Sequence, residues 1–467
     1  MTRALTAAGD LSPGSLYVSA TYSLTCLAGG PSPGAAGTLW LMATDTVSPV
    51  AGVCRAAKAA AAPLAALDTR VKDAALHAIA DALVARAPEI LEANRRDLEA
   101  GRANAIGSAL LDRLALDLTR IAAIADGARA IAALPDPVGE TIDGHRLPSG
   151  VDVRRVRVPF GVVAVVYEAR PNVTIDAAAL CLKSGNAIVL RGSSTATHSN
   201  AVLATIASEA ATQAGVPYGA IQLLAGGGRG ELTELATQDG VVDLIFPRGG
   251  EGLKDALKAV ATVPVIYAAS GNCHVYVDAD ADLDAAEAIA LNAKVHRPGV
   301  CNAAETLLVH ADVAAEFLPR VLRTLHTVGV ELRVDERAAD HARDQEGAIA
   351  TVPATDEDWA TEYLDLILAV KVVDSAEEAI AHVNRYGSGH SEAIVTEDLG
   401  AARAFQLGVD AACVYVNAST RFTDGGEFGM GAEIGNSTQK LHARGPIGLR
   451  ELCTFKYLIE GTGQVRV

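Results

Sequence analysis

Residues 161–190 read GVVAVVYEARPNVTIDAAALCLKSGNAIVL and contain the pattern that decides the fold. Residues 161–167 form a continuous apolar run, which is typical of a strand buried on both faces. Apolar residues recur at helical spacing over 173–181, and a second apolar run follows at 187–190. A strand, a helix and a strand in this order predict a parallel β-α-β unit.

The alternation of strands and helices continues after this unit. The expected elements are a helix at 195–213, a strand at 221–224, a short helix after Gly230, a strand at 241–246, a helix at 252–260 and a strand at 265–268. This order predicts a doubly wound, Rossmann-like parallel sheet, in which ligands bind at the carboxyl ends of the strands. The turns expected there are basic or glycine-rich, as phosphate-binding turns are. GGGRG at 226–230 lacks the spacing of a full dinucleotide fingerprint and is equally an ordinary glycine-rich turn.

A second α/β unit begins near Gly271. Its expected elements are helices at 285–294, 313–328 and 375–386, and strands at 306–309, 331–334, 367–373, 392–396 and 411–416. The sequence therefore predicts an α/β protein with two doubly wound domains.

The N-terminal part has two different compositions. The first 41 residues are rich in Gly, Ser, Thr and Pro, which predicts a disordered extension, and Met42 is a candidate start of translation. Residues 43–133 show helical periodicity, with Asp68 and Thr69 as a start signal and the prolines at 135 and 137 as a stop signal.

A β-hairpin is expected at 140–158, with its turn at Asp143 and Gly144. The last predicted strand, 452–459, belongs beside this hairpin. Because an arm of unpaired strands usually pairs with something, we expect it to contact a second copy of the chain in a homo-oligomer.

Composition excludes several classes of protein. The formal net charge of −17 argues against a nucleic-acid or acidic-membrane partner. Seven cysteines without CxxC or zinc spacing indicate free thiols in a reducing cytoplasm, and no metal site is expected. No GxSxG motif is present, which disfavours a serine hydrolase.

Residues 292–310, NAKVHRPGVCNAAETLLVH, place Cys301 on a tight turn between a predicted helix and a predicted strand. A nucleophile needs such a fixed but reachable position. Lys294, His296 and Arg297 are close enough in sequence to stabilise a thiolate. An isolated cysteine is more often a small buried apolar residue, so the choice depends on the surrounding motifs.

Four long motifs resemble the gamma-glutamyl phosphate reductases, a family within the aldehyde dehydrogenase superfamily. They are the segment 296–310, YEARPNVTIDAAALCLKSGNAIVLRG at 167–192, DLIFPRGG at 243–250 and VYVNASTRFTDGGEFGMGAEIGNSTQKLHARGPIGL at 414–449. The similarity runs in order from about residue 46 to the C-terminus. It implies an NADP-binding domain at 42–138 and 159–270, a catalytic domain at 271–420, a returning segment at 421–449, and an oligomerisation arm at 139–158 and 450–467.

The resemblance also implies the reaction, an NADPH-dependent reduction of L-glutamate 5-phosphate to L-glutamate 5-semialdehyde in proline biosynthesis. Cys301 would form a thioester, and Asn172 would donate to the oxyanion. Asn172 alone is equally well explained as a helix cap. Hydrolytic aldehyde dehydrogenases carry a Glu that activates water, whereas residues 268–272 here read AASGN.

Binding residues follow from the same resemblance. Arg191 matches a Lys that contacts the adenosine ribose, Ser194 matches a Glu of NAD-preferring members, and Glu362 matches the Glu that holds the nicotinamide ribose. Ser in place of Glu leaves room for a 2′-phosphate and favours NADP. The remaining candidates for the cofactor are Ser193, Arg248, Gly249 and Gly250.

The substrate carries an amino group, a carboxylate and a phosphate, and Arg binds such anions in a bidentate manner. The candidate substrate-binding residues are Arg170, Arg297, His390, Asn417, Ser419, Thr420 and Arg421. Each Arg taken alone is more often part of a structural ion pair.

Two alternatives stay open at this point. One is a different acylating, NADP-dependent aldehyde dehydrogenase, and the other is a non-catalytic nucleotide-binding scaffold. No kinase domain is fused to the chain, so a separate glutamate 5-kinase is a candidate partner that would supply the labile acyl phosphate.

Overall fold

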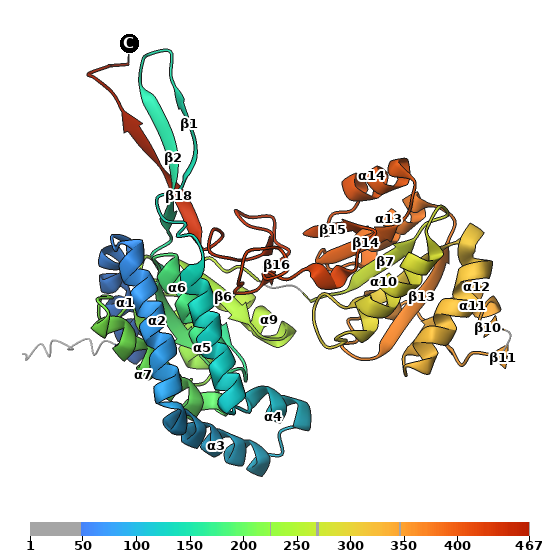
Figure 1. The fold of residues 1–467 in the computed structure, drawn as a ribbon, viewed down its shortest axis with the longest axis horizontal. Helices are drawn as coiled ribbons and strands as arrows, with labels where there is room; N and C mark the ends of the chain where they lie inside the picture. Colours follow the sequence, from blue (N-terminus) through green and yellow to red (C-terminus); the bar gives the residue numbers. More distant parts are fainter. Residues whose placement is uncertain (1–47, 225, 268–269, 345–346, 467) are drawn as a thin grey trace, which may run out of the picture. The chain divides into compact units, whose positions relative to one another are not determined.

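The computed structural model describes residues 48–224, 226–267, 270–344 and 347–466 (Figure 1). The expected extension at 1–41 lies outside these residues. None of the helices described is long and apolar enough to cross a membrane. Within the same residues, no group of His, Cys, Asp and Glu is placed to hold a metal ion.

A helical layer precedes the first sheet, as predicted. It consists of α1 (Pro49–Ala65), α2 (Thr69–Ala85), α3 (Ala87–Ala103), α4 (Ser108–Leu114) and α5 (Leu118–Ala133). The Ser48 hydroxyl caps α1 by accepting the Ala51 N–H at 3.1 Å, and Pro49 occupies the first turn. α2 packs against α5 and α7, and its alanine and leucine face joins the large apolar core around the first sheet.

The first sheet is parallel and has four strands. Their order is β5 (Ile221–Leu223), β4 (Ala187–Arg191), β3 (Val162–Tyr167) and β6 (Leu244–Arg248). The connecting helices are α6 (Asn172–Lys183), α7 (Thr197–Gln213), α8 (Arg229–Ala236) and α9 (Glu251–Val260), with a short 3-10 helix at Ser194–Ala196. Strand order reverses at β3, so the loops after β3 and β6 meet where ligands bind in such sheets.

The prediction of a strand at 265–268 is wrong for residues 265–267, which are the part of this segment that the structure describes. Val265 forms only one parallel bridge, to Ile245 of β6, and the backbone then leaves the sheet.

The second sheet is also parallel and has seven strands. Their order is β12 (Val352–Pro353), β9 (Glu331–Val334), β13 (Ile367–Val373), β8 (Ala304–His310), β7 (Cys273–Val277), β14 (Ser391–Val395) and β15 (Cys413–Val416). Its helices are α10 (Leu283–Val295), α11 (Ala311–Thr327), α12 (Glu336–Asp340), α13 (Ala376–Tyr386) and α14 (Leu399–Gly408). Two pairs of two-residue strands lie outside this sheet: β10 (Arg343–Asp344) with β11 (Gly347–Ala348), and β16 (Asn436–Ser437) with β17 (Gly445–Pro446). The predicted fold of two doubly wound domains is confirmed.

The arm is a separate antiparallel ribbon of β1 (Thr141–Arg146), β2 (Asp152–Pro159) and β18 (Cys453–Glu460), drawn away from the helices in Figure 1. The predicted pairing of the last strand with the hairpin is confirmed, because β18 pairs with β2 along its full length. The predicted turn at Asp143 and Gly144 is wrong, since both residues lie inside β1. The chain turns instead at 147–151, where Gly150 adopts a positive φ of 84° and the Leu147 N–H bonds the Val151 carbonyl at 2.8 Å.

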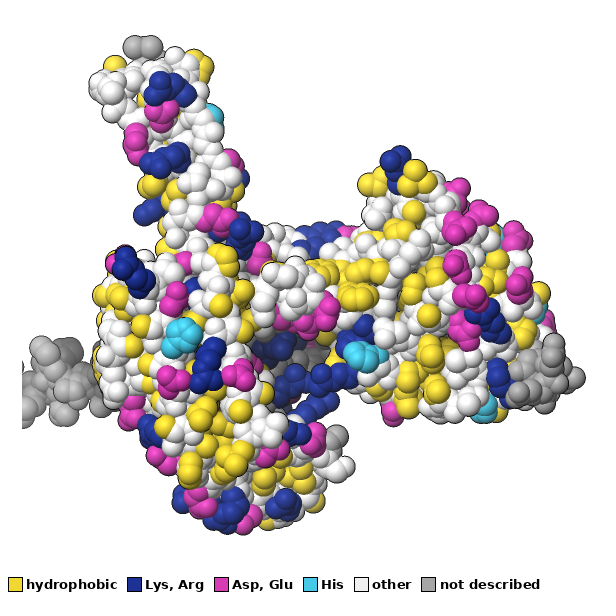
Figure 2. Space-filling model, viewed as in Figure 1, with side chains coloured by type: hydrophobic (Ala, Val, Ile, Leu, Met, Phe, Trp, Pro, Cys, Tyr) yellow, Lys and Arg dark blue, Asp and Glu magenta, His cyan; other side chains and the backbone are white. Residues whose placement is uncertain are grey.

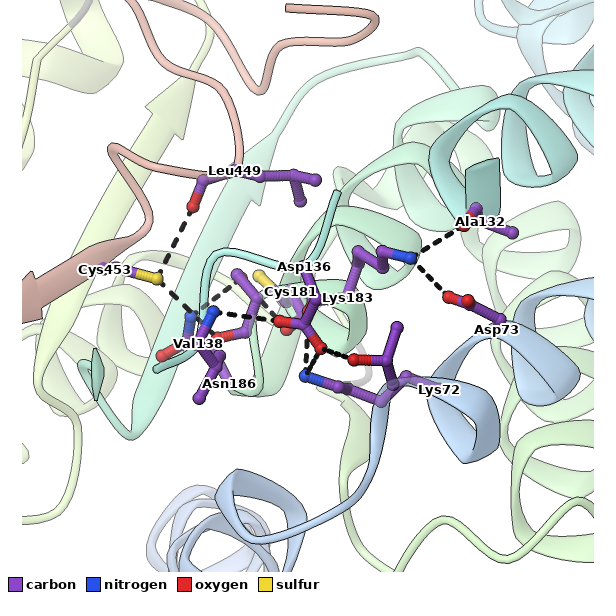
Figure 3. Close-up of polar contacts among 12 residues, drawn as sticks. Lys72, Asp73, Ala132, Asp136, Val138, Cys181, Lys183, Asn186, Leu449 and Cys453 are labelled. Atoms are coloured by element: carbon purple, nitrogen blue, oxygen red, sulfur yellow. Dashed lines mark hydrogen bonds and ion pairs between the residues drawn. The ribbon is translucent and has the colours of Figure 1, made fainter. Parts of the chain in front are cut away.

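Buried lysines join the helical layer to the base of the arm (Figure 3). Lys72 of α2 is 1% exposed and forms an ion pair with Asp136, which lies just before the arm. Lys183, at the end of α6, pairs with a carboxylate of α2. The Asn186 amide donates to the Leu452 carbonyl at 2.8 Å, immediately before β18. The arm is therefore anchored by paired charges and a satisfied amide.

Candidate active site

The Cys301 loop lies between α10 and β8, at the amino edge of the second sheet. Cys301 is exposed as a residue, although the protein atoms around its sulfur partly remove the thiol from water. The backbone of Gly271 lies so close to the Cys301 loop that a methyl group added at Gly271 would overlap the Cys301 carbonyl. The Cys273 thiol donates to that carbonyl at 3.2 Å, and the Glu362 carboxylate accepts the Gly271 N–H at 2.6 Å. The backbone of the candidate nucleophile is therefore fixed on one side by the start of β7.

Asn302 fixes the other side of the loop. Its amide donates to the Thr423 carbonyl at 2.9 Å and to the Arg421 carbonyl at 3.3 Å. The Thr420 hydroxyl donates to the Asn302 carbonyl at 2.7 Å, and the Ser419 hydroxyl accepts the Arg421 N–H at 3.3 Å. These bonds bring the segment after β15 to the Cys301 loop and occupy the hydroxyls of two candidate substrate-binding residues.

The charges around Cys301 differ from the expectation. Lys294 is fully buried and forms an ion pair with Glu305 at 2.5 Å, so its charge is compensated away from the loop. His296 and Arg297 are exposed. Burial raises the pKa of the Cys301 thiol, and Arg248, at the end of β6, is the positive group that most lowers it. The prediction that Lys294 stabilises the thiolate is therefore wrong. Arg248 is the cation that favours the thiolate form of Cys301.

Several arginines near the thiol or near one another form no ion pair, although the carboxylates of Glu362 and Glu433 also act on the thiol. Within the described residues, the arginines of this group that form no ion pair are Arg113, Arg170, Arg248, Arg297 and Arg421. Burial, followed by the other arginines, lowers the pKa of Arg170, and burial followed by Arg297 lowers that of Arg421. Lys and Arg also gather near the centre of the face drawn in Figure 2. Unpaired, mutually repelling cations in an acidic protein form a site for an anion.

Arg113 was not found by sequence reasoning. It belongs to α4 in the helical layer, where the periodic pattern indicated only a structural role. Its positive charge contributes to lowering the pKa of Arg170, after burial and Arg248. No local motif marks this role, because it depends on packing between distant segments.

Asn172 is the first residue of α6, directly after the loop that follows β3. Its side chain makes no capping bond but donates to the Asp176 carboxylate at 2.9 Å, one turn further along the helix. The helix-cap explanation is therefore wrong. Burial raises the pKa of Asp176 to about 6.

The cofactor candidates lie at the carboxyl ends of β4 and β6. Ser194 is exposed at the start of the 3-10 helix, and the Ser193 hydroxyl accepts the Ala169 N–H at 3.4 Å. Arg191 donates to the Gly227 carbonyl at 2.6 Å. α9 begins after Gly249 and Gly250 without a side-chain cap from Gly250, and the Gly250 N–H itself donates to the Glu168 carboxylate at 3.3 Å. A helix start of this kind suits phosphate oxygens. These residues fit a dinucleotide with its pyrophosphate at the helix start.

Two further candidate substrate-binding residues, His390 and Asn417, form their hydrogen bonds with groups outside the Cys301 loop. His390 is fully buried, with Nδ1 at 2.8 Å from the Ser391 hydroxyl, and burial lowers its pKa to about 4. Both groups of the Asn417 amide bond the backbone of Thr396, after the carboxyl end of β14 and thus at the edge opposite Cys301.

Known proteins resemble this fold and site along most of the chain. The model of the aldehyde dehydrogenase family matches residues 32–342 and 347–456. The chain belongs to the aldehyde dehydrogenase family.

Curated relatives that share more than half of the matched residues carry one name, gamma-glutamyl phosphate reductase. The protein of Heliobacterium modesticaldum is 55% identical over 410 residues, which are 88% of this chain and 97% of the relative. That of Thermobifida fusca is 54% identical over 423 residues, covering 91% and 100%. The crystal structure of the Thermotoga maritima protein of the same name has a TM-score of 0.87 and 45% identity, covering 90% of this chain and 100% of that one.

Arg248→Gln is expected to raise the Cys301 pKa further, because a cation that favours the thiolate is removed. Alkylation of the Cys301 peptide by iodoacetamide at pH 8, followed by mass spectrometry, should slow by a factor of about three to ten. Arg337→Gln, which removes an exposed and paired arginine, is the control and should leave the rate unchanged. Equal alkylation rates in both variants would contradict the assignment of Arg248.

Proposed function

We propose that the protein reduces L-glutamate 5-phosphate to L-glutamate 5-semialdehyde and releases phosphate. The observation that carries this proposal is one exposed thiol surrounded by unpaired arginines in a chain of net charge −17. A neutral aldehyde does not need such a site, whereas a dianionic acyl phosphate does. The names of the curated relatives support the same reaction.

In the first step, the Cys301 thiolate attacks the acyl carbon. A carbon–sulfur bond forms, the carbon–oxygen bond to phosphate breaks, and phosphate leaves toward the arginines. The tetrahedral oxyanion is stabilised by the Cys301 N–H and by the Asn172 amide. Hydrogen bonds donated by the Cys273 thiol and the Asn302 side-chain amide hold the backbone of the loop that carries the attacking sulfur.

The second step reduces the thioester to the aldehyde. A nicotinamide dinucleotide supplies the hydride when bound, as in other aldehyde dehydrogenases, which use NAD or NADP. Arg191, Ser193, Ser194 and the turn at Arg248, Gly249 and Gly250 would hold its phosphates and adenosine end, and Glu362 its nicotinamide ribose. The thiohemiacetal on Cys301 then collapses and restores the thiol.

The chain must also keep water from the thioester. At the place where hydrolytic family members have a catalytic Glu, the chain has Ala268 and no acid follows before Cys273. The Asn272 amide donates to the backbone carbonyls of Trp359 and Tyr386, both at 2.8 Å, and an amide oxygen is too weak a base to activate water. This supports reduction over hydrolysis.

The proposed reaction is tested in reverse, by following NADPH formation from glutamate semialdehyde, NADP and phosphate. Turnover should require phosphate, and Cys301→Ser should lower kcat by about a thousandfold or more. Cys54→Ala, in α1, is the control and should retain turnover. Turnover with acyl-CoA but not with the acyl phosphate would instead favour another acylating dehydrogenase.

We also propose NADP as the cofactor, because exposed Ser194 leaves room for a 2′-phosphate. Ser194→Glu should raise the KM for NADPH relative to that for NADH by about tenfold, since like charges repel. Thr205→Glu adds the same charge at an exposed position further along α7 and should leave the ratio unchanged. An unaltered ratio in Ser194→Glu would remove this argument for NADP.

The arm is proposed as a contact between copies of the chain. Phe455, Tyr457 and Ile459 alternate along β18, share one face, and are 44%, 57% and 66% exposed. The double variant Tyr457→Asp, Ile459→Asp should lower the molar mass in light scattering. Lys456→Asp, on the alternate face, should leave the mass unchanged; the same mass in all three proteins would speak against the arm as an interface.

A further inference from the structure

Asp176 is a carboxylate next to the candidate oxyanion donor, and the mechanism above gives it no task. We propose that Asp176 is a positioning residue whose carboxylate accepts one N–H of the Asn172 amide and so directs the other N–H to the acyl oxygen on Cys301. This inference rests on the proposed function, because it assumes that Asn172 stabilises the oxyanion.

The two residues are placed for this contact by the helix itself. Asn172 and Asp176 are four residues apart on α6, so their side chains share one face. Nδ2 of Asn172 lies 2.9 Å from Oδ2 of Asp176. Within the described residues, no Lys, Arg or His forms an ion pair with Asp176. The amide of Asn172 is therefore the group to which this carboxylate is bonded.

The charge on Asp176 decides which way the amide points. An ionised carboxylate only accepts hydrogen bonds, so the NH₂ group of Asn172 has to face it. The amide nitrogen carries two N–H groups, and the second one remains for the reacting oxygen. Without the carboxylate, the amide can rotate and present its own oxygen instead, which would repel an oxyanion.

The surroundings of Asp176 supply little compensation for its charge. α5 faces Asp176 at Gly127, which has no side chain to offer. A methyl group added at Gly127 would lie 3.9 Å from Oδ1 of Asp176. Arg248 of β6 lowers its pKa, but less than the bond from Asn172 does. Lys183, on the same helix, is paired at the other end, and the Tyr167 hydroxyl of β3 is bonded to a threonine. Burial therefore dominates and raises the pKa of Asp176 to about 6.

The raised pKa of Asp176 lowers the free energy of unfolding at neutral pH. An Asp in the unfolded chain has a pKa of about 3.9, so the folded state binds this proton more tightly. The unfavourable contribution appears as the pH rises from about 4 and is complete above about 6. A carboxylate that destabilises the fold next to a reacting group is typical of a functional residue.

The test compares Asp176→Asn, Asp176→Ala and Asn172→Ala with the wild type in the reverse assay. Asp176→Ala should lower kcat by about tenfold with little change in KM. Asp176→Asn should lower kcat less, because its amide oxygen still accepts, while its Tm at pH 8 should exceed that of the wild type. Asp278→Asn removes a buried carboxylate away from the site, bonded to Tyr276 and Thr396, and should lower Tm without lowering kcat.

The pH profile separates positioning from a structural effect. The ratio of wild-type to Asp176→Ala turnover should fall below pH 6 toward the ratio of Asp176→Asn to Asp176→Ala turnover, because protonated Asp176 of the wild type is then a neutral acceptor like Asn. Dividing by the variant removes the titration of the thiol, which both proteins share. A ratio that is constant with pH would overturn the proposal.

Asn172→Ala distinguishes the two ways to fail. If it loses turnover by about a hundredfold while both Asp176 variants keep wild-type kcat, the proposal about Asp176 is wrong and the proposed mechanism stands. If Asn172→Ala keeps full turnover, the oxyanion role itself is wrong. A lower Tm together with a lower kcat in Asp176→Asn would also overturn the proposal, because it would indicate a structural carboxylate.

Discussion

The close approach of Gly271 to the Cys301 carbonyl is the contact on which the site depends. Any side chain at Gly271 would occupy the space of that carbonyl, so the loop can take this position only against glycine. Cys273 and Asn302 then hold the same loop from β7 and from the segment after β15. Because packed elements hold both sides, the thiol is presented at the surface without being mobile.

The arginines near the thiol differ from many others in the described chain in forming no ion pair with a carboxylate. Most arginines of the described chain are paired with carboxylates, for example Arg333 with Asp358 at 2.6 Å. Around Cys301 several are left unpaired, and one half-buried carboxylate, Asp176, forms no ion pair among the described residues. Both arrangements are unfavourable for the isolated fold and become favourable when an anionic substrate and an oxyanion enter.

The sequence predicted the parts of the fold that depend on local patterns. Continuous apolar runs identified β3 and β4, and the Asp68 and Thr69 signal identified the start of α2, although Asp68 makes no capping hydrogen bond. It misplaced the hairpin turn because Gly150, with its positive φ, competes better for the turn than the Asp143 and Gly144 pair. It misjudged Lys294 and missed Arg113, since the partner of the first and the neighbours of the second lie on other segments. Three-dimensional proximity of this kind leaves no periodic signal in one sequence.

The pairing of β18 with β2 joins segments about three hundred residues apart, from 152–159 to 453–460. During synthesis on the ribosome, β2 therefore emerges long before its partner exists. The nascent chain carries an open strand edge until residues 453–460 are made, although both Rossmann-like sheets can form earlier. Completion of the ribbon thus reports that translation has passed residue 460, and a product that stops before this point would display an unpaired edge to chaperones or proteases.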